Sequence, residues 1–469
     1  MTSAARRTRR AAAAALLAAA AWACPSTAQP PGPRARLPER PHVLLVLIDD
    51  LRQLRHSPAQ PPARLPHLDR LAASPGAVGF SRAYAPVPVC GASRASLLTE
   101  LAPTADRFLD FDSRVDADAP GAQTLPGFFA AHGYETRGYG KVFHHRDDHL
   151  EDWTAGHFTP NAPATGWRQY AGEAAQALAE RPGERGPPVE EGRDAAGRDL
   201  PDRLYHDART VDELLGDLEA DARFPERPVL YAVGLVKPHL PFVAPGRCWD
   251  LYGEADLDPA RPLVPAEGLP GATFHESWEL LTYSGVPGPP PYEPGFQRRL
   301  LHGYLAAASF ADAQLGRILD GLDASGLADR TVVVVASDHG YLLGEQGVWT
   351  KHALFEPALH VPLVVRLPAG PGADPPPARV DASLVSLTDL FPTLAGFAGL
   401  PVPEGLDGRD LSPWLLEPGP PLLEPVVSRW KGGVSVRTPG ARVTTWPDGS
   451  GVRFDLENDP LEREPQGLR

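Results

Sequence analysis

Cysteine, methionine and lysine are all scarce in this 469-residue chain, which contains three cysteines, one methionine and four lysines. Cys24 lies in a leader-like N-terminal stretch, so Cys90 and Cys248 are the cysteines left for the mature chain. Two cysteines exclude a disulfide framework. The stability of a chain of this length must therefore come from a large buried core.

The chain also has fewer basic than acidic residues. The 45 basic residues are outnumbered by 59 acidic ones, which gives a formal net charge of −14, and no basic run follows the first ten residues. Proteins that bind nucleic acids need local basic clusters to neutralise phosphates. The composition therefore argues against a nucleic-acid partner.

Long hydrophobic runs are also missing. The basic stretch MTSAARRTRR is followed by AAAAALLAAAAWA and then by small residues, a pattern that predicts a signal peptide over residues 1–28. The apolar run is shorter than the roughly twenty residues that a membrane span needs, so we expect no transmembrane segment. The mature protein is predicted to be exported to the periplasm or the extracellular space. Lipid attachment at Cys24 is the alternative, although its flanking residues make a poor lipobox.

Five short apolar runs alternate with helical patterns, which predicts an α/β fold with a large, mostly parallel sheet covered by helices on both faces. The predicted strand regions are 42–50, 134–144, 227–239, 331–340 and 360–368. The predicted helices are 68–74, 124–133, 207–221 and 300–326, with a further helix opening at Cys90.

The last part of the chain has a different pattern. After Trp414 come four short strand-like pieces, VVSRW, GVSVRT, ARVTTW and GVRFDL, which predict a small antiparallel subdomain over 415–469 after a catalytic domain over 40–414. Three Pro/Gly-rich segments are expected to be surface insertions that frame a substrate cleft. They span residues 182–199, 284–295 and 369–378.

Acidic pairs follow two of the predicted strands. Asp49 and Asp50 follow the first, and Asp338 and His339 follow a later one. Each pair alone fits a turn or a cap. The carboxyl ends of parallel strands, however, meet at one edge of a sheet, so together the residues indicate a site for a hard cation such as Ca²⁺ or Mg²⁺.

The four lysines are Lys141, Lys237, Lys351 and Lys431, and the first three lie in loops at the ends of predicted strands. A chain that uses arginine almost everywhere else retains lysine where a compact ammonium group with mobile donors is wanted. The three positions therefore indicate an anion site. For Lys237, within KPHLPF, a rigid extended turn is the alternative.

These segments, in this order, resemble the formylglycine-dependent type I sulfatases, specifically the iduronate-2-sulfatase branch and its bacterial relatives. The motifs are a strand ending in DD, CGASR opening a helix, GKVFH, KPHLPF and SDHGYLLGEQGVWTKH. The resemblance covers nearly the whole mature chain. It implies an alkaline-phosphatase-like fold and a sulfatase that acts on a sulfated carbohydrate.

In that family the cysteine of the CGASR-type motif is converted to formylglycine, whose hydrate is the nucleophile. The resemblance therefore implies that a formylglycine-generating enzyme modifies Cys90. It also implies that one divalent ion, Ca²⁺, is held by Asp49, Asp50, Asp338, His339 and the modified Cys90. A helix N-terminus at Cys90, with Arg94 one turn further on, independently offers dipole and charge to an anion.

The remaining roles are also implied by the resemblance. Arg94 would steady the formylglycine hydrate, Lys141 would hold its second hydroxyl group, and His144 would be the base. His239 and Lys351 would bind sulfate oxygens, as would Lys141, and would stabilise or protonate the leaving alkoxide.

A few positions differ from the commoner family pattern. Ala92 replaces the usual proline, and Glu100 stands where glycine is common. His339 in place of asparagine, His144 three residues after Lys141, and KPHLPF favour the iduronate-2-sulfatase branch, and hence a 2-O-sulfated uronic acid as substrate. His352, beside Lys351, fits a plain loop residue equally well.

Two other functions stay open at this point. One is hydrolysis of phosphate or phosphonate esters within the alkaline phosphatase superfamily, because sites for tetrahedral anions differ little. The other is an inactive carbohydrate-binding relative, which predicts the loss of at least one metal or sulfate residue.

Overall fold

The computed structural model describes residues 37–54, 63–160, 169–259, 264–369, 374–403 and 405–468. The predicted signal peptide and Cys24 lie outside the described residues. Among the described residues, no helix is both long enough and apolar enough to cross a membrane.

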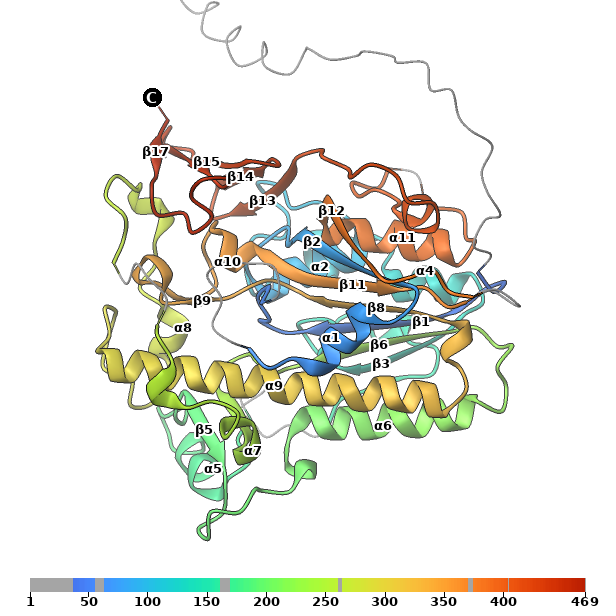
Figure 1. Cartoon of the computed structure of the whole chain (residues 1–469), viewed down its shortest axis with the longest axis horizontal. Coiled ribbons are helices and arrows are strands. Elements are labelled where there is room, and N and C mark those ends of the chain that lie inside the picture. The colour runs from blue at the N-terminus through green and yellow to red at the C-terminus, as the bar shows by residue number, and fades with distance from the viewer. Residues whose placement is uncertain are drawn as a thin grey trace, which may run out of the picture. The chain divides into compact units, whose positions relative to one another are not determined.

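An eight-stranded sheet forms the centre of the catalytic part, with the strand order β12-β2-β11-β8-β1-β6-β3-β4 (Figure 1). β11 runs antiparallel to both of its neighbours, and all the other pairs are parallel. The mixed, mostly parallel sheet predicted from the sequence is thereby confirmed. The strands are β1 His42–Ile48, β2 Ala77–Tyr84, β3 Glu135–Gly140, β4 His157–Phe158, β6 Val229–Leu235, β8 Thr331–Ser337, β11 His360–Arg366 and β12 Arg379–Ser386.

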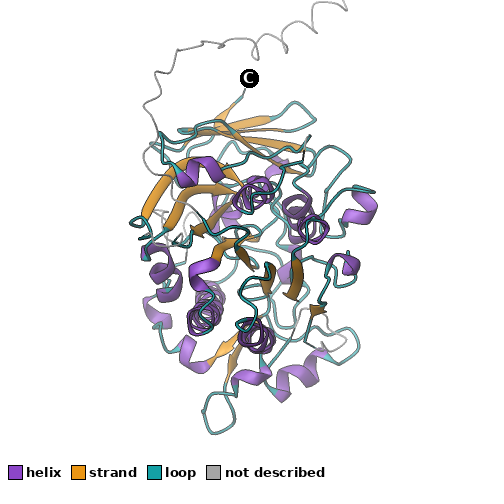
Figure 2. Ribbon diagram, turned by 90° about the vertical axis from the view of Figure 1, so that its right-hand side faces the viewer, coloured by secondary structure: helices purple, strands orange, loops and turns teal. Residues whose placement is uncertain are grey.

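Helices cover both faces of this sheet, as the end-on view in Figure 2 shows. They are α1 Pro66–Ala73, α2 Cys90–Thr99, α3 Val115–Asp118, α4 Leu125–Ala131, α5 Glu173–Ala179, α6 His206–Asp221, α7 Gly246–Trp249, α8 Trp278–Leu281, α9 Pro294–Ala324, α10 Glu356–Leu359, α11 Leu390–Phe397 and α12 Ser412–Leu416.

Two hydrophobic cores lie on opposite faces of the sheet, because successive strand residues point to opposite sides. Val43, Leu45 and Leu47 of β1 pack with α2, α4 and α11, whereas Leu44 and Val46 pack with α1, α6 and α9. Burial on both faces explains why β1 is a continuous apolar run rather than an alternating one.

The 31-residue helix α9 begins at Pro294, inside a segment that we predicted as a surface insertion. Proline suits the first turn of a helix because its missing N–H group has no intrahelical partner there. The predicted insertion over 284–295 was therefore wrong for its last two residues, 294 and 295, which belong to the helix.

The predicted insertion over 182–199 also contains regular structure. β5 (Val189–Gly192) pairs in parallel with β7 (Phe242–Pro245), the strand that directly follows the KPHLPF turn. Much of this segment is therefore a support for that turn and not a free surface loop. The pairing joins positions about fifty residues apart, so no local pattern could show it.

The C-terminal strands form a separate five-stranded antiparallel sheet, as predicted. They are β13 Val426–Trp430, β14 Gly433–Arg437, β15 Ala441–Thr445, β16 Gly451–Asp455 and β17 Gln466–Gly467, and the short pair β9 Leu342–Leu343 and β10 Trp349–Thr350 lies between β8 and β11 in the chain. Val426 and Trp430 join one core of the catalytic part, and Val452 and Phe454 pack with Leu342. The boundary between residues 414 and 415 stays a prediction.

A largely buried ionic network joins this C-terminal sheet to α10. Glu356 of α10 forms ion pairs with Arg442 of β15 and Arg437 of β14, and it accepts a hydrogen bond from the hydroxyl of Tyr84 at 2.7 Å. Burial by itself would raise the pKa of Glu356, but the two arginines hold that pKa well below its usual range. The carboxylate is therefore charged at neutral pH and binds the sheet to the catalytic part.

We expect Glu356→Gln to destabilise the protein by about 3 kcal/mol, because it leaves the buried Arg442 without a full counter-charge. Denaturant unfolding of the purified protein would measure this difference. Glu226→Gln is a matched control, since Glu226 pairs with Arg330 while 81 % of its side chain is exposed. Equal effects of the two substitutions would contradict a special role for the buried network.

Candidate active site

Four strand connections bring the predicted site residues to one edge of the sheet. Asp49 and Asp50 follow β1, and Asp338 and His339 follow β8, which pairs with β1 in register so that Ile48 lies beside Ser337. Cys90 begins α2, which follows β2. Because β11 runs in the opposite direction, the segment that precedes it, with Lys351, also reaches this edge.

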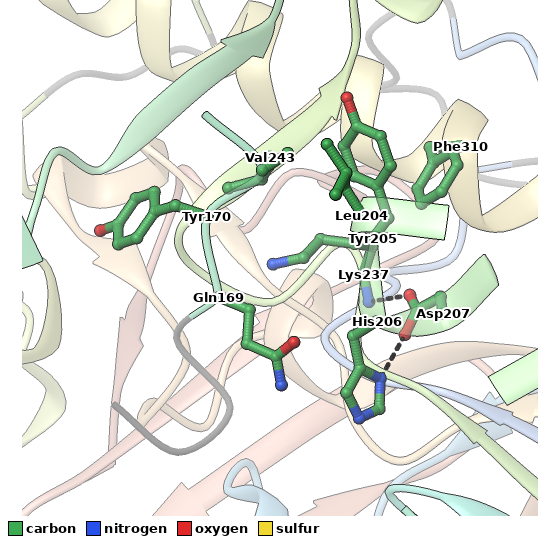
Figure 3. A pocket seen from close by; sticks show the side chains of 10 residues that line it. Gln169, Tyr170, Leu204, Tyr205, His206, Asp207, Lys237, Val243 and Phe310 are labelled. Carbon is green, nitrogen blue, oxygen red and sulfur yellow. Dashed lines mark hydrogen bonds and ion pairs between the residues drawn. The ribbon is translucent and has the colours of Figure 1, made fainter. Parts of the chain in front are cut away.

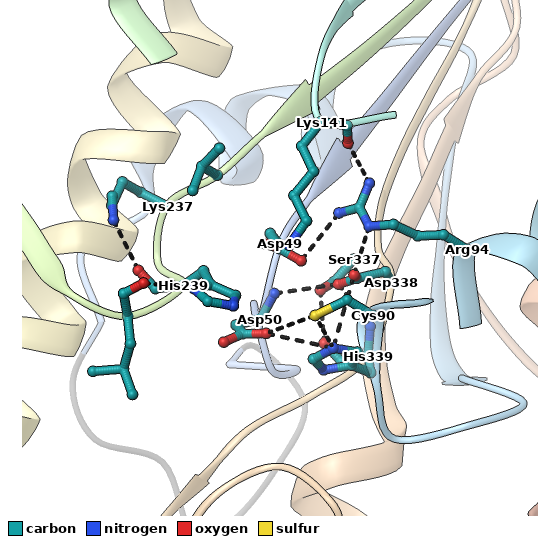
Figure 4. Close-up of polar contacts among 12 residues, drawn as sticks. Asp49, Asp50, Cys90, Arg94, Lys141, Lys237, His239, Ser337, Asp338 and His339 are labelled. Carbon is teal, nitrogen blue, oxygen red and sulfur yellow. Dashed lines mark hydrogen bonds and ion pairs between the residues drawn. The ribbon is translucent and has the colours of Figure 1, made fainter. Parts of the chain in front are cut away.

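Cys90 lies between the two acidic pairs (Figure 4). Ligand atoms of Asp49, Asp50, Cys90 and His339 all lie within 4.8 Å of one another, and all four side chains are buried. The Cys90 Sγ is 3.2 Å from His339 Nε2 and 3.9 Å from Asp50 Oδ1. The structure thus brings four of the five predicted metal ligands into one group.

Asp338, the fifth predicted ligand, lies at the border of this group. One carboxylate oxygen accepts hydrogen bonds from the backbone N–H groups of Asp50 and His339, at 3.2 and 3.0 Å. The other oxygen accepts a hydrogen bond from Arg94 Nε at 2.8 Å and lies 3.8 Å from His339 Nε2.

Arg94 and Lys141 neutralise one side of the site. Arg94 donates to Asp49 at 3.1 Å and to the carbonyl oxygens of Lys141 and Val142, and Lys141 Nζ donates to Asp49 Oδ2 at 2.5 Å. Burial by itself would raise the pKa of Asp49, yet Lys141 and Arg94 hold it well below its usual range. Asp49 is therefore a permanent carboxylate.

Asp50 behaves differently. Burial raises its pKa well above the usual range, the Asp49 carboxylate adds to this rise, and Lys351 opposes it. The buried carboxylates of Asp49 and Asp50 lie side by side, next to the His339 imidazole. A divalent cation bound by these groups would offset the repulsion between the two negative charges. The residues present therefore fit a hard divalent ion.

The Cys90 thiol is unsuited to act as a nucleophile in its unmodified form. Burial and the neighbouring Asp49 carboxylate raise its pKa well above the usual range, which disfavours the thiolate. Reactive cysteines are found in the opposite environment, with lowered pKa values. The surroundings of residue 90 thus favour an uncharged group at this position.

Lys351 and His239 place two nitrogen groups beside Asp50, one cationic and one neutral. Lys351 Nζ lies 3.0 Å from both carboxylate oxygens of Asp50. His239 Nδ1 lies 2.6 Å from the carbonyl oxygen of Leu240, so Nδ1 carries the proton and Nε2 faces the site. Burial, Lys351 and Lys141 lower the pKa of His239 well below its usual range, which makes the imidazole neutral.

Glu279 of α8 was not predicted as a site residue. Its carboxylate lies 3.1 Å from Lys351 Nζ and 3.3 Å from His239 Nε2, and the residue is 6 % exposed. It therefore connects the two groups that face an incoming anion. The segment around it carries no motif, and its position becomes evident only from the fold.

We expect Glu279→Gln to lower kcat/KM about 10- to 100-fold, the usual cost of losing a group that orients active-site ligands. Lys351 and His239 would lose their common partner, whereas Asp49 and Asp50 would keep theirs. Steady-state kinetics with a sulfated sugar would measure the change, with Glu279→Asp expected to recover part of the loss. An unchanged kcat/KM in a variant with a normal melting temperature would contradict the role.

His144 follows β3, close to the charges of Lys141 and Asp49. Burial and then Lys141 lower its pKa well below the usual range, so the ring is neutral, as a base requires. His352 is also buried, but its ring packs 4.8 Å from that of Trp278 and 5.4 Å from that of Trp430. His352 therefore packs among aromatic side chains, which agrees with its interpretation as a loop residue.

Lys237 supports the loop from behind. Its Nζ donates to the carbonyl oxygens of His239 and Pro241 at 2.9 and 2.6 Å, and its backbone N–H donates to Asp207. Burial lowers its pKa to about 8. Lys237 also lines a pocket with His206 and Asp207 on the far side of the turn (Figure 3). The rigid-turn interpretation of KPHLPF is the one that these contacts support.

Buried carboxylates that fit a cation, next to lysine and histidine side chains, at the edge of an α/β sheet, are typical of hydrolases for esters of tetrahedral oxyanions. A family model described as Sulfatase matches residues 41–400. The chain therefore belongs to the sulfatase family, and it is a sulfuric ester hydrolase with the alkaline-phosphatase-like fold of that family.

Two curated relatives and one solved structure illustrate the likeness. Iduronate 2-sulfatase of Homo sapiens is 34 % identical over 397 residues, which cover 77 % of this chain and 70 % of the relative. An ulvan-active sulfatase of Formosa agariphila is 28 % identical and covers 91 % and 77 %. A phosphonate monoester hydrolase from Silicibacter pomeroyi has a TM-score of 0.68 at 22 % identity, covers 89 % and 90 %, and shows the fold alone.

Proposed function

We propose that this protein removes sulfate from a sulfated carbohydrate, a 2-O-sulfated uronic acid at a chain end, through a formylglycine hydrate made from Cys90. The observation that carries the proposal is the position of Cys90. It begins a buried helix, lies 3.2 Å from His339 and belongs to the same four-residue group as Asp49 and Asp50. The iduronate 2-sulfatase relative supports the choice of substrate.

In the proposed enzyme the Cys90 Sγ stands where the oxygens of the formylglycine hydrate would lie. Arg94 donates to Asp49, Asp338 and two carbonyl groups, so it would steady the formylglycine hydrate by fixing the carboxylates around residue 90. Asp49, Asp50, Asp338, His339 and residue 90 would hold Ca²⁺. The ion would supply positive charge that offsets the charge gathering on the sulfuryl oxygens.

The reaction would proceed in two steps. A hydrate oxygen of residue 90 would attack sulfur, so that one S–O bond forms as the ester S–O bond breaks and the alcohol leaves. The proton that the attacking hydroxyl group loses would balance the proton that the alcohol gains from His239. The second hydroxyl group, held by Lys141, then passes its proton to His144. The electron pair that this O–H bond leaves would restore the C=O bond and expel sulfate, and addition of water to the aldehyde would then restore the hydrate.

His239 and Lys351 would receive the sulfate group. A bound sulfate ester brings negative charge, which counteracts the effect of Lys351 and Lys141 on His239 and favours its protonated form. A protonated His239 could then donate to the leaving oxygen while Lys351 binds a sulfate oxygen.

The proposal includes two steps before catalysis. The N-terminal 28 residues would direct export, and a formylglycine-generating enzyme would modify Cys90 before folding buries it, since Cys90 is 2 % exposed in the folded chain. Lipid attachment at Cys24 would be excluded by a mature N-terminus at or beyond residue 29.

Sulfate release from disaccharides with a terminal 2-O-sulfated uronic acid tests the function, using protein co-expressed with the maturation enzyme. We expect release from these disaccharides and little from a phosphate or phosphonate monoester. Release from other sulfated sugars alone would overturn the uronate assignment. Faster hydrolysis of the phosphonate than of the sulfate ester would favour a phosphate or phosphonate ester hydrolase. Absence of any activity in protein that carries formylglycine would favour an inactive carbohydrate-binding protein.

A further inference from the structure

Two large aromatic side chains, Phe111 and Trp278, are exposed next to each other. Phe111 is 44 % exposed and Trp278 is 38 % exposed. Their ring centroids are 6.0 Å apart and the rings are inclined at 44°. Single exposed apolar side chains are common on protein surfaces, but an exposed aromatic pair in contact needs an explanation.

Each member of the pair belongs to a segment that borders the candidate site. The Phe111 carbonyl oxygen lies against Gly91, so close that a Cβ atom on Gly91 would approach it to 2.3 Å, and Gly91 is the neighbour of Cys90. Trp278 immediately precedes Glu279, whose carboxylate contacts Lys351 and His239. Two segments that are remote in sequence, each next to a part of the candidate site, thus bring their aromatic rings into contact.

The Trp278 ring packs against a buried side chain. Its centroid lies 4.8 Å from that of His352, which is buried and follows Lys351 in the chain. The indole is therefore supported on one side by the anion site and remains partly open to solvent. A rigid, supported and partly exposed indole is suited to binding a flat apolar surface.

We infer that Phe111 and Trp278, here called the aromatic platform, bind the pyranose ring linked to the sulfated sugar of an oligosaccharide. A pyranose ring offers an apolar face of C–H groups, which packs on aromatic rings, while its hydroxyl groups stay in water. The inference rests on the proposed function and deepens it, because it assigns a binding site to the neighbouring sugar. Among the described residues, no cation–π contact joins either ring to Arg94, Lys141 or Lys351. The aromatic platform would therefore act on substrate affinity and leave the chemical steps to the buried groups.

Steady-state kinetics with a sulfated disaccharide and the matching sulfated monosaccharide tests this assignment. For the disaccharide we expect Trp278→Ala and Phe111→Ala each to raise KM about 3- to 10-fold, with kcat changed less than about twofold. For the monosaccharide, KM should stay near that of the wild type. Trp278→Phe should retain most of the disaccharide affinity, because it keeps an aromatic ring.

Phe224→Ala is the matched control. Phe224 is 63 % exposed and precedes β6, so it lies at the amino end of the parallel strands, whereas the active site lies at their carboxyl ends. We expect unchanged KM values for both sugars with this variant. Melting temperatures near that of the wild type would show that all the variants are folded.

Two outcomes would overturn the assignment separately. A wild-type enzyme that is active on both sugars, with KM values that the platform substitutions change equally or not at all, overturns the aromatic platform alone. A wild-type enzyme that carries formylglycine and releases sulfate from neither sugar overturns the proposed function and the platform with it.

Discussion

Cys90→Ala is expected to abolish sulfate release, with a loss in kcat of about 10⁴-fold or more, the usual consequence of deleting a nucleophile. The reason is structural as well as chemical. Cys90 is enclosed by Asp49, Asp50 and His339, and alanine offers no oxygen or sulfur atom in its place. The measurement is sulfate release by the purified variant, alongside peptide mass spectrometry of the wild type to show the cysteine-to-aldehyde change at residue 90.

Cys248→Ala provides the matched control, because Cys248 is the other buried free cysteine among the described residues. It lies in α7 and packs with Val243 and Phe310, in a cluster apart from the reaction centre. We expect near wild-type activity for this variant. If Cys90→Ala kept substantial activity, the formylglycine mechanism would be wrong, whatever the substrate.

Asp50→Asn should reduce divalent-ion affinity by at least about 100-fold and lower activity in parallel. The substitution keeps the shape of the side chain and removes one of the buried carboxylates proposed to bind the hard cation. Metal analysis of the dialysed protein and thermal unfolding with and without Ca²⁺ would measure the effect. At Ca²⁺ a hundredfold above Kd, the wild type should gain about 2.7 kcal/mol of stability and the variant close to none.

In the metal-free protein, Asp50→Asn is expected to improve stability relative to the wild type as pH rises. Because the folded-state pKa of Asp50 is raised, its ionisation weakens the fold as pH rises above the unfolded pKa near 3.8. The contribution of Asp50 to the stability of the metal-free protein should therefore fall from about pH 4 upwards, and the difference in stability between wild type and Asp50→Asn should change in that direction. Unchanged ion content in the variant, or a steeper loss with rising pH than in the wild type, would contradict the assignment of Asp50 as a ligand.

The fold was predictable where local pattern and burial agree. The runs that became β1, β6 and β8 are buried on both faces, so each reads as a continuous apolar stretch. β12, at the edge of the sheet, has a mixed burial pattern, and our sequence analysis did not find it. The parallel pair β5 and β7 was missed for another reason, since its first strand is short and lies in a Pro/Gly-rich segment.

The candidate active site likewise contains residues that the sequence predicted and residues that it did not. Asp49, Asp50, Asp338 and His339 were predictable as a group, because they directly follow strands and parallel strands end at one edge. Glu279 was not predictable, since a glutamate on a four-residue helix carries no signal of its own. The hydrogen bonds that the Lys237 ammonium group donates within its own turn were not predictable either, because they depend on the direction of its side chain in the folded protein.

The sequence by itself determined the fold class, the family resemblance and most of the residues of the candidate site, because these follow from short apolar runs and from motifs at strand ends. Only the tertiary structure decided that Asp338 borders the metal group, that Glu279 joins Lys351 to His239, and that Phe111 meets Trp278 beside Cys90. The physical reason is that these contacts join segments from 40 to about 290 residues apart. Their geometry depends on how loops pack over the sheet, which no local pattern encodes.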